Sequence, residues 1–129
     1  MKGKKLGDAE LDIMKAIWQS DKPLTANEIL AVIQGHRKWP LSTLMTSLNR
    51  LAEKGFVSCD RTFRYNLYSA LVNENDYKAQ EGQAFLTKLY GNSVSGFVSN
   101  LYDNRAIDEK DLDGLRKFLD ALEKGSNDG

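Results

Sequence analysis

STLMTSLNRLAEKG, residues 42–55, has two different faces when it is wound into a helix. Leu44, Leu48 and Leu51 recur at spacings of four and three, which places them on one apolar stripe. The opposite side carries small polar and basic side chains: Thr43, Thr46, Asn49, Arg50 and Lys54. The pattern predicts a helix that starts after Trp39-Pro40, ends at Gly55 and packs through its leucines, with its polar face free to contact something else.

Two shorter helices are predicted before this segment. The first is expected to open at Asp8 as its N-cap and to stop before Asp21-Lys22-Pro23. Its apolar stripe would consist of Leu11, Met14, Ile17 and Trp18. The second begins with TANE, residues 25–28, in which the Thr and Glu side chains can cap each other's backbone amides, and it is expected to end at Gly35.

After Gly55 the hydrophobic period changes from helical to alternating. In FVSCDRTFRYNLYSA, residues 56–70, the alternation predicts a hairpin that turns near residues 60–62. Val57 and Cys59 would then share a face with Phe63, Tyr65 and Leu67. Three short helices followed by a two-stranded ribbon predict a mostly α fold with a small β-hairpin wing, a winged helix-turn-helix.

This fold would place residues 42–55 in the major groove of DNA as the recognition helix. Thr43 and Thr46 are small enough to approach base edges, and Asn49 can pair with adenine. Four basic side chains are better suited to phosphates: Arg50, Lys54, Arg61 and Arg64. Two alternatives remain open, namely a solvated helix face and a winged-helix module that binds another protein.

Charge is distributed unevenly along the chain. Residues 1–70 carry 11 Lys and Arg against 7 Asp and Glu, whereas residues 71–129 carry 7 against 11. His36, Arg37 and Lys38 add to the basic residues around the predicted recognition helix. This distribution favours polyanion binding by a domain at residues 1–70.

Residues 71–129 are predicted to form a helical dimerisation region. Residues 73–124 are rich in apolar side chains, from Tyr77 onward, and a small winged helix has no room to cover them all. The expected interface residues are Phe97, Val98, Leu101, Leu112, Leu115, Leu119 and Leu122. A homodimer would suit a palindromic operator; a monomeric helical cap folded back on the winged helix is the alternative.

Composition narrows the function classes. No run of apolar residues approaches a membrane span, and no signal peptide is recognised at the start, so we expect a cytoplasmic protein without a membrane partner. With one cysteine, Cys59, and one histidine, His36, neither a disulfide nor a Cys/His metal site is expected. No catalytic constellation has informative spacing, so we expect no enzyme activity and no cofactor.

The ordered series of motifs resembles the penicillinase-repressor family of bacterial regulators (BlaI, MecI, CopY). The similar segments are LGDAELDIMKAIW (6–18), TANEIL (25–30), WPLSTLMTSLNRL (39–51), EKGFV (53–57), NENDY (73–77), FLTKLYGNSVSGFVSNLYDN (85–104) and DLDGLRKFLDAL (111–122). The resemblance implies homodimeric repressors with an N-terminal winged helix and a C-terminal dimerisation region. Two positions depart from it: Pro40 follows Trp39 directly, and Phe63 stands where relatives often have glycine before the arginine matching Arg64.

The resemblance also implies a release mechanism. In the antibiotic-responsive branch, a sensor-controlled protease cuts a dimerisation helix between an Asn and an apolar residue, and Asn100-Leu101 is the corresponding pair here. The alternative is a helix-packing leucine beside a surface amide. Copper-responsive relatives carry paired cysteines near the C-terminus, so the single Cys59 argues against copper sensing by that route.

Overall fold

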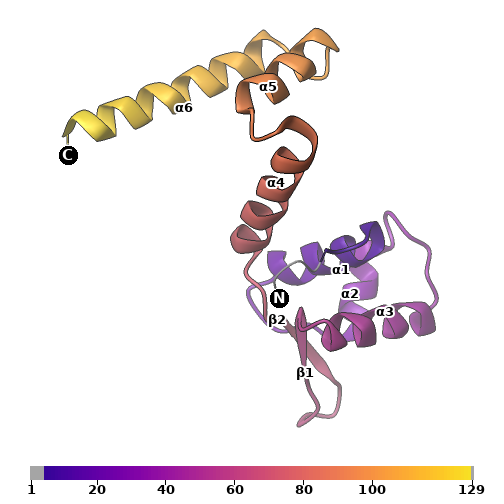
Figure 1. The fold of residues 1–129 in the computed structure, drawn as a ribbon. Coiled ribbons are helices and arrows are strands. Elements are labelled where there is room, and N and C mark those ends of the chain that lie inside the picture. Colours follow the sequence, from indigo (N-terminus) through magenta and orange to yellow (C-terminus); the bar gives the residue numbers. More distant parts are fainter. Residues whose placement is uncertain (1–4, 129) are drawn as a thin grey trace. The chain divides into compact units, whose positions relative to one another are not determined.

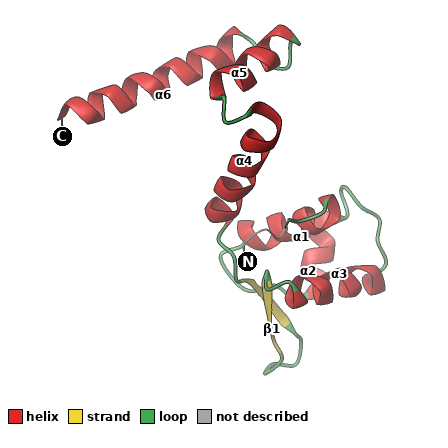
Figure 2. Cartoon of the chain, viewed as in Figure 1, coloured by secondary structure: helices red, strands yellow, loops and turns green. Residues whose placement is uncertain are grey.

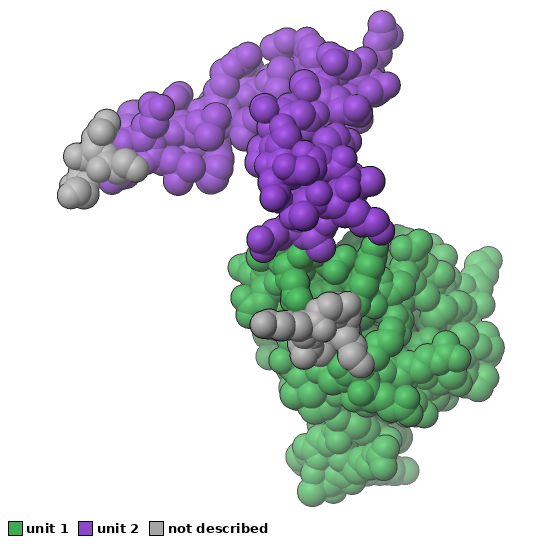
Figure 3. All heavy atoms as spheres, in the orientation of Figure 1, with its two compact units in different colours: residues 1–81 green, residues 82–129 purple. Residues whose placement is uncertain are grey.

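The structure, a computed structural model, describes the backbone of residues 5–128 and side chains as far as residue 125. In chain order the elements are α1 (Asp8–Gln19), α2 (Ala26–Ile33), α3 (Leu41–Glu53), β1 (Val57–Asp60), β2 (Leu67–Ala70), α4 (Glu74–Tyr90), α5 (Val94–Asp103) and α6 (Glu109–Asp128) (Figures 1 and 2). The chain divides into two compact units with the boundary between Glu81 and Gly82 (Figure 3). The predicted fold class, mostly helical with a hairpin wing, is confirmed.

The first two helices begin with different caps. Gly7, not Asp8, is the N-cap of α1, so that prediction was wrong; Asp8 is already helical and its carboxylate lies at the positive end of the helix. The Gly7 amide donates to Glu10 Oε1 at 3.0 Å. At α2 the predicted capping box is confirmed, because the Glu28 amide donates to Thr25 Oγ1 at 3.1 Å and the Thr25 amide to Glu28 Oε1 at 2.9 Å.

The core of the first unit forms where α1, α2, α3 and the hairpin meet. The leucine stripe of α3 is fully buried, as its spacing predicted. It packs in one cluster with side chains from every other element of the unit: Leu6, Ile13, Met14, Ala16, Ile17, Leu24, Ile29, Ile33, Phe56, Val57, Tyr68 and Tyr77. Burial of one face of α3 fixes the helix on the unit and leaves its opposite face in solvent.

The hairpin has a longer loop than the sequence predicted. β1 and β2 pair antiparallel with Val57 opposite Ala70 and Cys59 opposite Tyr68, and residues 61–66 connect them. Directly opposed residues share a face, so Tyr68 lies with Cys59, and Leu67 lies on the other side. The predicted face of Leu67 was wrong because a one-residue change of phase, set by the loop length, exchanges the two faces of a strand.

The first unit continues beyond the wing into the start of α4. Trp18 Nε1 donates to the Val72 carbonyl at 2.8 Å, and the buried Tyr77 hydroxyl accepts from the Leu6 amide at 2.9 Å. The Tyr77 ring lies 5.9 Å from those of both Trp18 and Phe56. These contacts carry the unit past Ala70, where the sequence predicted the end of a domain. Tyr77, which the sequence grouped with the dimerisation region, belongs to this core.

The second unit consists of the end of α4 with α5 and α6. Its aromatic rings form a small cluster, with centroids 5.1 Å apart for Tyr90 and Phe97, 5.5 Å for Phe85 and Phe97 and 6.1 Å for Phe85 and Tyr90. None of the side chains of residues 82–125 is buried. Within residues 5–128, no helix has both the length and the apolar character needed to span a membrane.

Candidate nucleic-acid interface

The polar side of α3 is exposed, as the helical pattern predicted. Thr43, Thr46, Asn49 and Arg50 all face solvent, opposite the buried leucines. Thr46 Oγ1 donates to the Ser42 carbonyl at 3.1 Å, which leaves the hydroxyl oxygen free to accept a bond from a base. The helix therefore presents short polar groups along its surface and a cation, Arg50, in its last turn.

Lys54, just after α3, is held differently from Arg50. Its ammonium lies 2.7 and 2.8 Å from the two carboxylate oxygens of Glu10, and both side chains are partly buried. Burial alone raises the pKa of the Glu10 carboxyl, but the bonds from Lys54 and the Gly7 amide outweigh it, so this pKa lies below its usual value. The ion pair ties α1 to the end of α3 and compensates the charge of Lys54.

The wing loop carries two exposed arginines, Arg61 and Arg64. Its first turn is fixed by the Asp60 carboxylate, which accepts from the Thr62 hydroxyl and from the Thr62 amide at 2.9 Å. These two bonds hold the pKa of Asp60 below its usual value. The Arg64 guanidinium lies 5.5 Å from the centre of the Tyr65 ring, a cation–π arrangement. The arginine pair predicted from the sequence thus lies on one exposed loop.

Two features near this surface were not predicted. A hollow of about 140 Å³ lies where three elements meet. It is lined by the start of α2, Met45 of α3 and Tyr65 of the wing. Arg37, counted in the sequence only as a basic residue, pairs with Asp12 at 2.8 Å and lies 5.7 Å from the centre of the Trp39 ring. The hollow and the Arg37–Asp12 pair have no local signal in the sequence, because their residues lie far apart along the chain; the Arg37–Trp39 contact is local but was not predicted.

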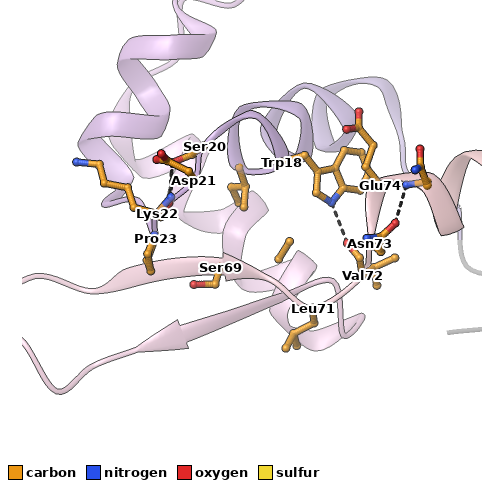
Figure 4. Close-up of a pocket in the computed structure, with 13 residues that line it drawn as sticks. Trp18, Ser20, Asp21, Lys22, Pro23, Ser69, Leu71, Val72, Asn73 and Glu74 are labelled. Atoms are coloured by element: carbon orange, nitrogen blue, oxygen red, sulfur yellow. Dashed lines mark hydrogen bonds between the residues drawn. The ribbon is translucent and has the colours of Figure 1, made fainter.

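A larger hollow, of about 640 Å³, is bounded by the end of α1, residues 20–23 and residues 69–75 (Figure 4). Its polar side chains bond to neighbouring backbone: Ser20 Oγ donates to the Lys22 carbonyl at 2.6 Å, and Asn73 Oδ1 accepts from the Asn75 amide at 2.9 Å. The Trp18 side chain lines the hollow and is held there by its hydrogen bond to the Val72 carbonyl. The hollow is thus framed by the turns that lead into α2 and α4.

The predicted interface residues of the second unit are only partly covered. Phe97, Val98, Leu101, Leu112 and Leu115 have intermediate exposure, whereas Leu119 and Leu122 are 49% and 53% exposed. The proposed cleavage pair lies inside α5. The Asn100 carbonyl accepts from the Asn104 amide at 3.2 Å and from its side chain at 2.8 Å, and the Leu101 carbonyl accepts from the Ala106 amide at 2.8 Å.

Comparison with known proteins accords with this architecture. Residues 6–121 match the family described as penicillinase repressor. The chain is 32% identical to the penicillinase repressor of Staphylococcus aureus over 90% of this chain and 91% of that protein. It is 30% identical to the methicillin resistance regulatory protein MecI of Mammaliicoccus sciuri, over 88% and 92%.

A solved structure is similar to part of this chain. The DNA-binding domain of the repressor BlaI, a solution structure, covers 57% of this chain and 88% of its own length, with 32% identity and a TM-score of 0.50. The described elements of that part are the three helices and hairpin of a winged helix-turn-helix. The chain therefore belongs to the penicillinase repressor family, whose members are transcriptional repressors and not enzymes.

Proposed function

We propose that this protein is a homodimeric transcriptional repressor that binds a palindromic operator in the cytoplasm through α3 and the wing. The observation that carries the proposal is the exposed face of α3, where polar side chains and Arg50 lie opposite a fully buried leucine stripe. A relative at 32% identity is named a repressor, and the similar BlaI fragment is named a DNA-binding domain. Both names support the same use of this surface.

The side chains would divide into two roles. Thr43, Thr46 and Asn49 are short enough to contact base edges in the major groove and so provide specificity. Arg50, Arg61 and Arg64 are long and exposed, which suits them to phosphates on either side of the groove. Lys54 would contribute less than Arg50, because Glu10 already compensates its charge.

The exposed apolar side chains of the second unit support a dimer. Seven large apolar side chains in it are at least 40% exposed: Phe85, Leu89, Val94, Tyr102, Phe118, Leu119 and Leu122. Exposed apolar surface on this scale is characteristic of an interface. A second copy would supply the missing cover, and two recognition helices related by twofold symmetry would match an inverted repeat. Within the dimerisation region predicted at residues 71–129, we propose that the contacts lie after Gly82.

DNA binding is tested with duplexes from the promoter region of the chain's own gene. The logarithm of affinity should fall with the logarithm of salt concentration, with a slope of about −0.9 per neutralised phosphate. Arg50→Ala should weaken binding to all sequences, whereas Thr46→Ala should lose about 1–3 kcal/mol of discrimination at one base pair. Lys15→Ala on α1 is the matched charge control. Failure to bind any duplex would favour a protein-interaction module.

Release of the repressor would involve the bond between Asn100 and Leu101. Because the Asn100 carbonyl accepts two hydrogen bonds within α5, a sensor-controlled protease would reach this bond only after local opening of the helix. Cutting there would separate α6 from the rest of the dimerisation region and weaken the dimer. Mass spectrometry before and after exposure of cells to a cell-wall antibiotic tests this: a fragment ending at Asn100 is expected, and derepression with an intact chain would refute it.

A further inference from the structure

The tip of the wing combines an exposed aromatic ring with positive charge. Phe63 is 63% exposed, the highest value among the phenylalanines with described side chains, and it lies between Arg61 and Arg64 in sequence. It takes part in none of the aromatic pairs found among residues 5–125. The loop extends away from the three helices of the first unit (Figure 1). Most of this ring is therefore left uncovered by the unit itself.

Hydrogen bonds hold the start of the loop, next to the ring. The Asp60 carboxylate holds the backbone and hydroxyl of Thr62, the residue immediately before Phe63. On the other side, Arg64 lies over the ring of Tyr65, and Tyr65 lines the hollow shared with α2 and α3. Tyr65, although 59% exposed, thus borders the hollow beside α2 and α3. Less conformational freedom has to be lost when a side chain next to such a held turn binds.

The charge around Phe63 selects its partner. Both neighbouring arginines are exposed, and along residues 60–64 their two positive charges exceed the single negative charge of Asp60. An apolar ring flanked by guanidinium groups suits the DNA minor groove, where phosphates border a narrow channel of base edges and sugars. Apolar wedges such as Phe enter this groove and partly unstack a base step in proteins that bend DNA. Since α3 would occupy the major groove, a wing at its side would meet the adjoining minor groove.

We propose that Phe63 is an apolar wedge that enters the minor groove beside the recognition helix, separates a base step and bends the operator. This inference rests on the proposed function, since it requires that α3 bind DNA. It adds a source of specificity that involves no hydrogen bond to a base. Pyrimidine–purine steps such as TA and CA unstack at the least cost, so the chain would favour operators that place such a step under the wing.

The test uses the full chain and duplexes selected with it from a random library. Bending is measured by energy transfer between dyes at the two duplex ends, and unstacking by the fluorescence of 2-aminopurine placed at successive steps. The wild-type chain should bend the duplex and raise the fluorescence at one step in each half-site. Phe63→Ala should abolish both signals and weaken binding about tenfold, because the ring's burial is lost while the cost of unstacking is avoided.

Three further variants separate the explanations. Phe63→Leu, which keeps an apolar wedge, should retain part of the bend, and Leu71→Ala, which shortens a side chain of similar exposure outside the wing, should behave as wild type. Wild-type bending by Phe63→Ala would overturn the wedge, and so would weakened binding with an unchanged bend. If Arg50→Ala still weakens binding to all sequences in that case, DNA recognition by α3 stands. If the wild-type chain selects no duplex, both proposals fail.

Discussion

The two units of the chain differ in how completely they cover their apolar side chains. In the first unit, three helices and a hairpin enclose a cluster in which nine large side chains are less than 2% exposed. In the second, a cluster of three rings joins α4 and α5, yet no side chain of residues 82–125 is buried. The first unit has a buried core such as an independent domain needs. The second has apolar side chains that stay exposed, as one side of a protein–protein interface does. The difference supports the proposal that the second unit is the one that pairs with another copy.

The largest expected effect is on the stability of the first unit, through its buried core. Phe56 is fully buried and lies edge-on to Tyr77, so Phe56→Ala should destabilise the first unit by about 3–5 kcal/mol. Phe63→Ala deletes the same ring from an exposed position and should change stability by less than about 0.5 kcal/mol. Urea unfolding of both variants measures the contrast. Equal destabilisation would mean that the wing tip is packed in solution.

A second experiment locates the end of the first unit. A fragment that ends at Glu81 should fold as a monomer, whereas one that ends at Ala70 should be about 3 kcal/mol less stable, because it lacks Tyr77 and the acceptor for Trp18 Nε1. Within the longer fragment, Tyr77→Phe should cost about 1–2 kcal/mol by leaving the Leu6 amide unpaired. Sedimentation and thermal unfolding distinguish these cases. Equal stability of the two fragments would place the boundary at Ala70.

Substitutions in the second unit should weaken the association of two copies and leave the stability of the first unit unchanged. Leu119→Ala and Leu122→Ala together should weaken the dimer about tenfold to a hundredfold, since each leucine would lose the burial that a partner provides. Unfolding of the first unit should not change. Lys117→Ala, on the same helix, serves as the control. Sedimentation velocity over a range of concentrations measures the effect, and a wild-type chain that stays monomeric throughout would contradict the proposed dimer.

The smallest expected effect is electrostatic and confined to the first unit. Because the pKa of Glu10 is lowered on folding, its pair with Lys54 stabilises above the usual glutamate pKa of 4.5 and loses this contribution as pH falls through the lower folded value. Glu10→Gln should cost about 1 kcal/mol or less near neutral pH and nothing in acid. Adding Lys54→Gln should cost little more. A stability difference that is independent of pH would show that the pair does not operate in solution.

Local patterns predicted the parts of the fold that depend on neighbouring residues. The leucines of α3 and the capping box of α2 each follow from spacings of three or four residues, so the helices and the exposed polar face could be predicted directly. The cap of α1 could not, because Gly7 and Asp8 are both common N-cap types and only one can occupy the position.

Contacts between distant residues were beyond the sequence pattern. Lys54 was predicted to contact phosphate; its pairing with Glu10, which lies on another helix, was not predicted. The helical pattern around Tyr77 predicts a helix there, but it does not predict which unit buries the Tyr77 side chain. In the wing, alternation predicted strands but not the loop length, and the loop length determined which side Leu67 faces. Where Thr43, Thr46, Asn49 and Arg50 meet bases or phosphates remains a prediction.

The uncovered apolar side chains of the second unit also bear on how long the protein lasts in a cell. A copy without a partner displays Leu119, Leu122 and Phe118 to chaperones and degradative proteases, which act on exposed apolar segments. Dimerisation would bury these side chains and so hide them from chaperones and proteases. The dimeric fraction increases with protein concentration by mass action. The lifetime of each copy should therefore increase with the abundance of the protein. Newly made repressor would be short-lived at first and become persistent as it accumulates, which sharpens the return to repression.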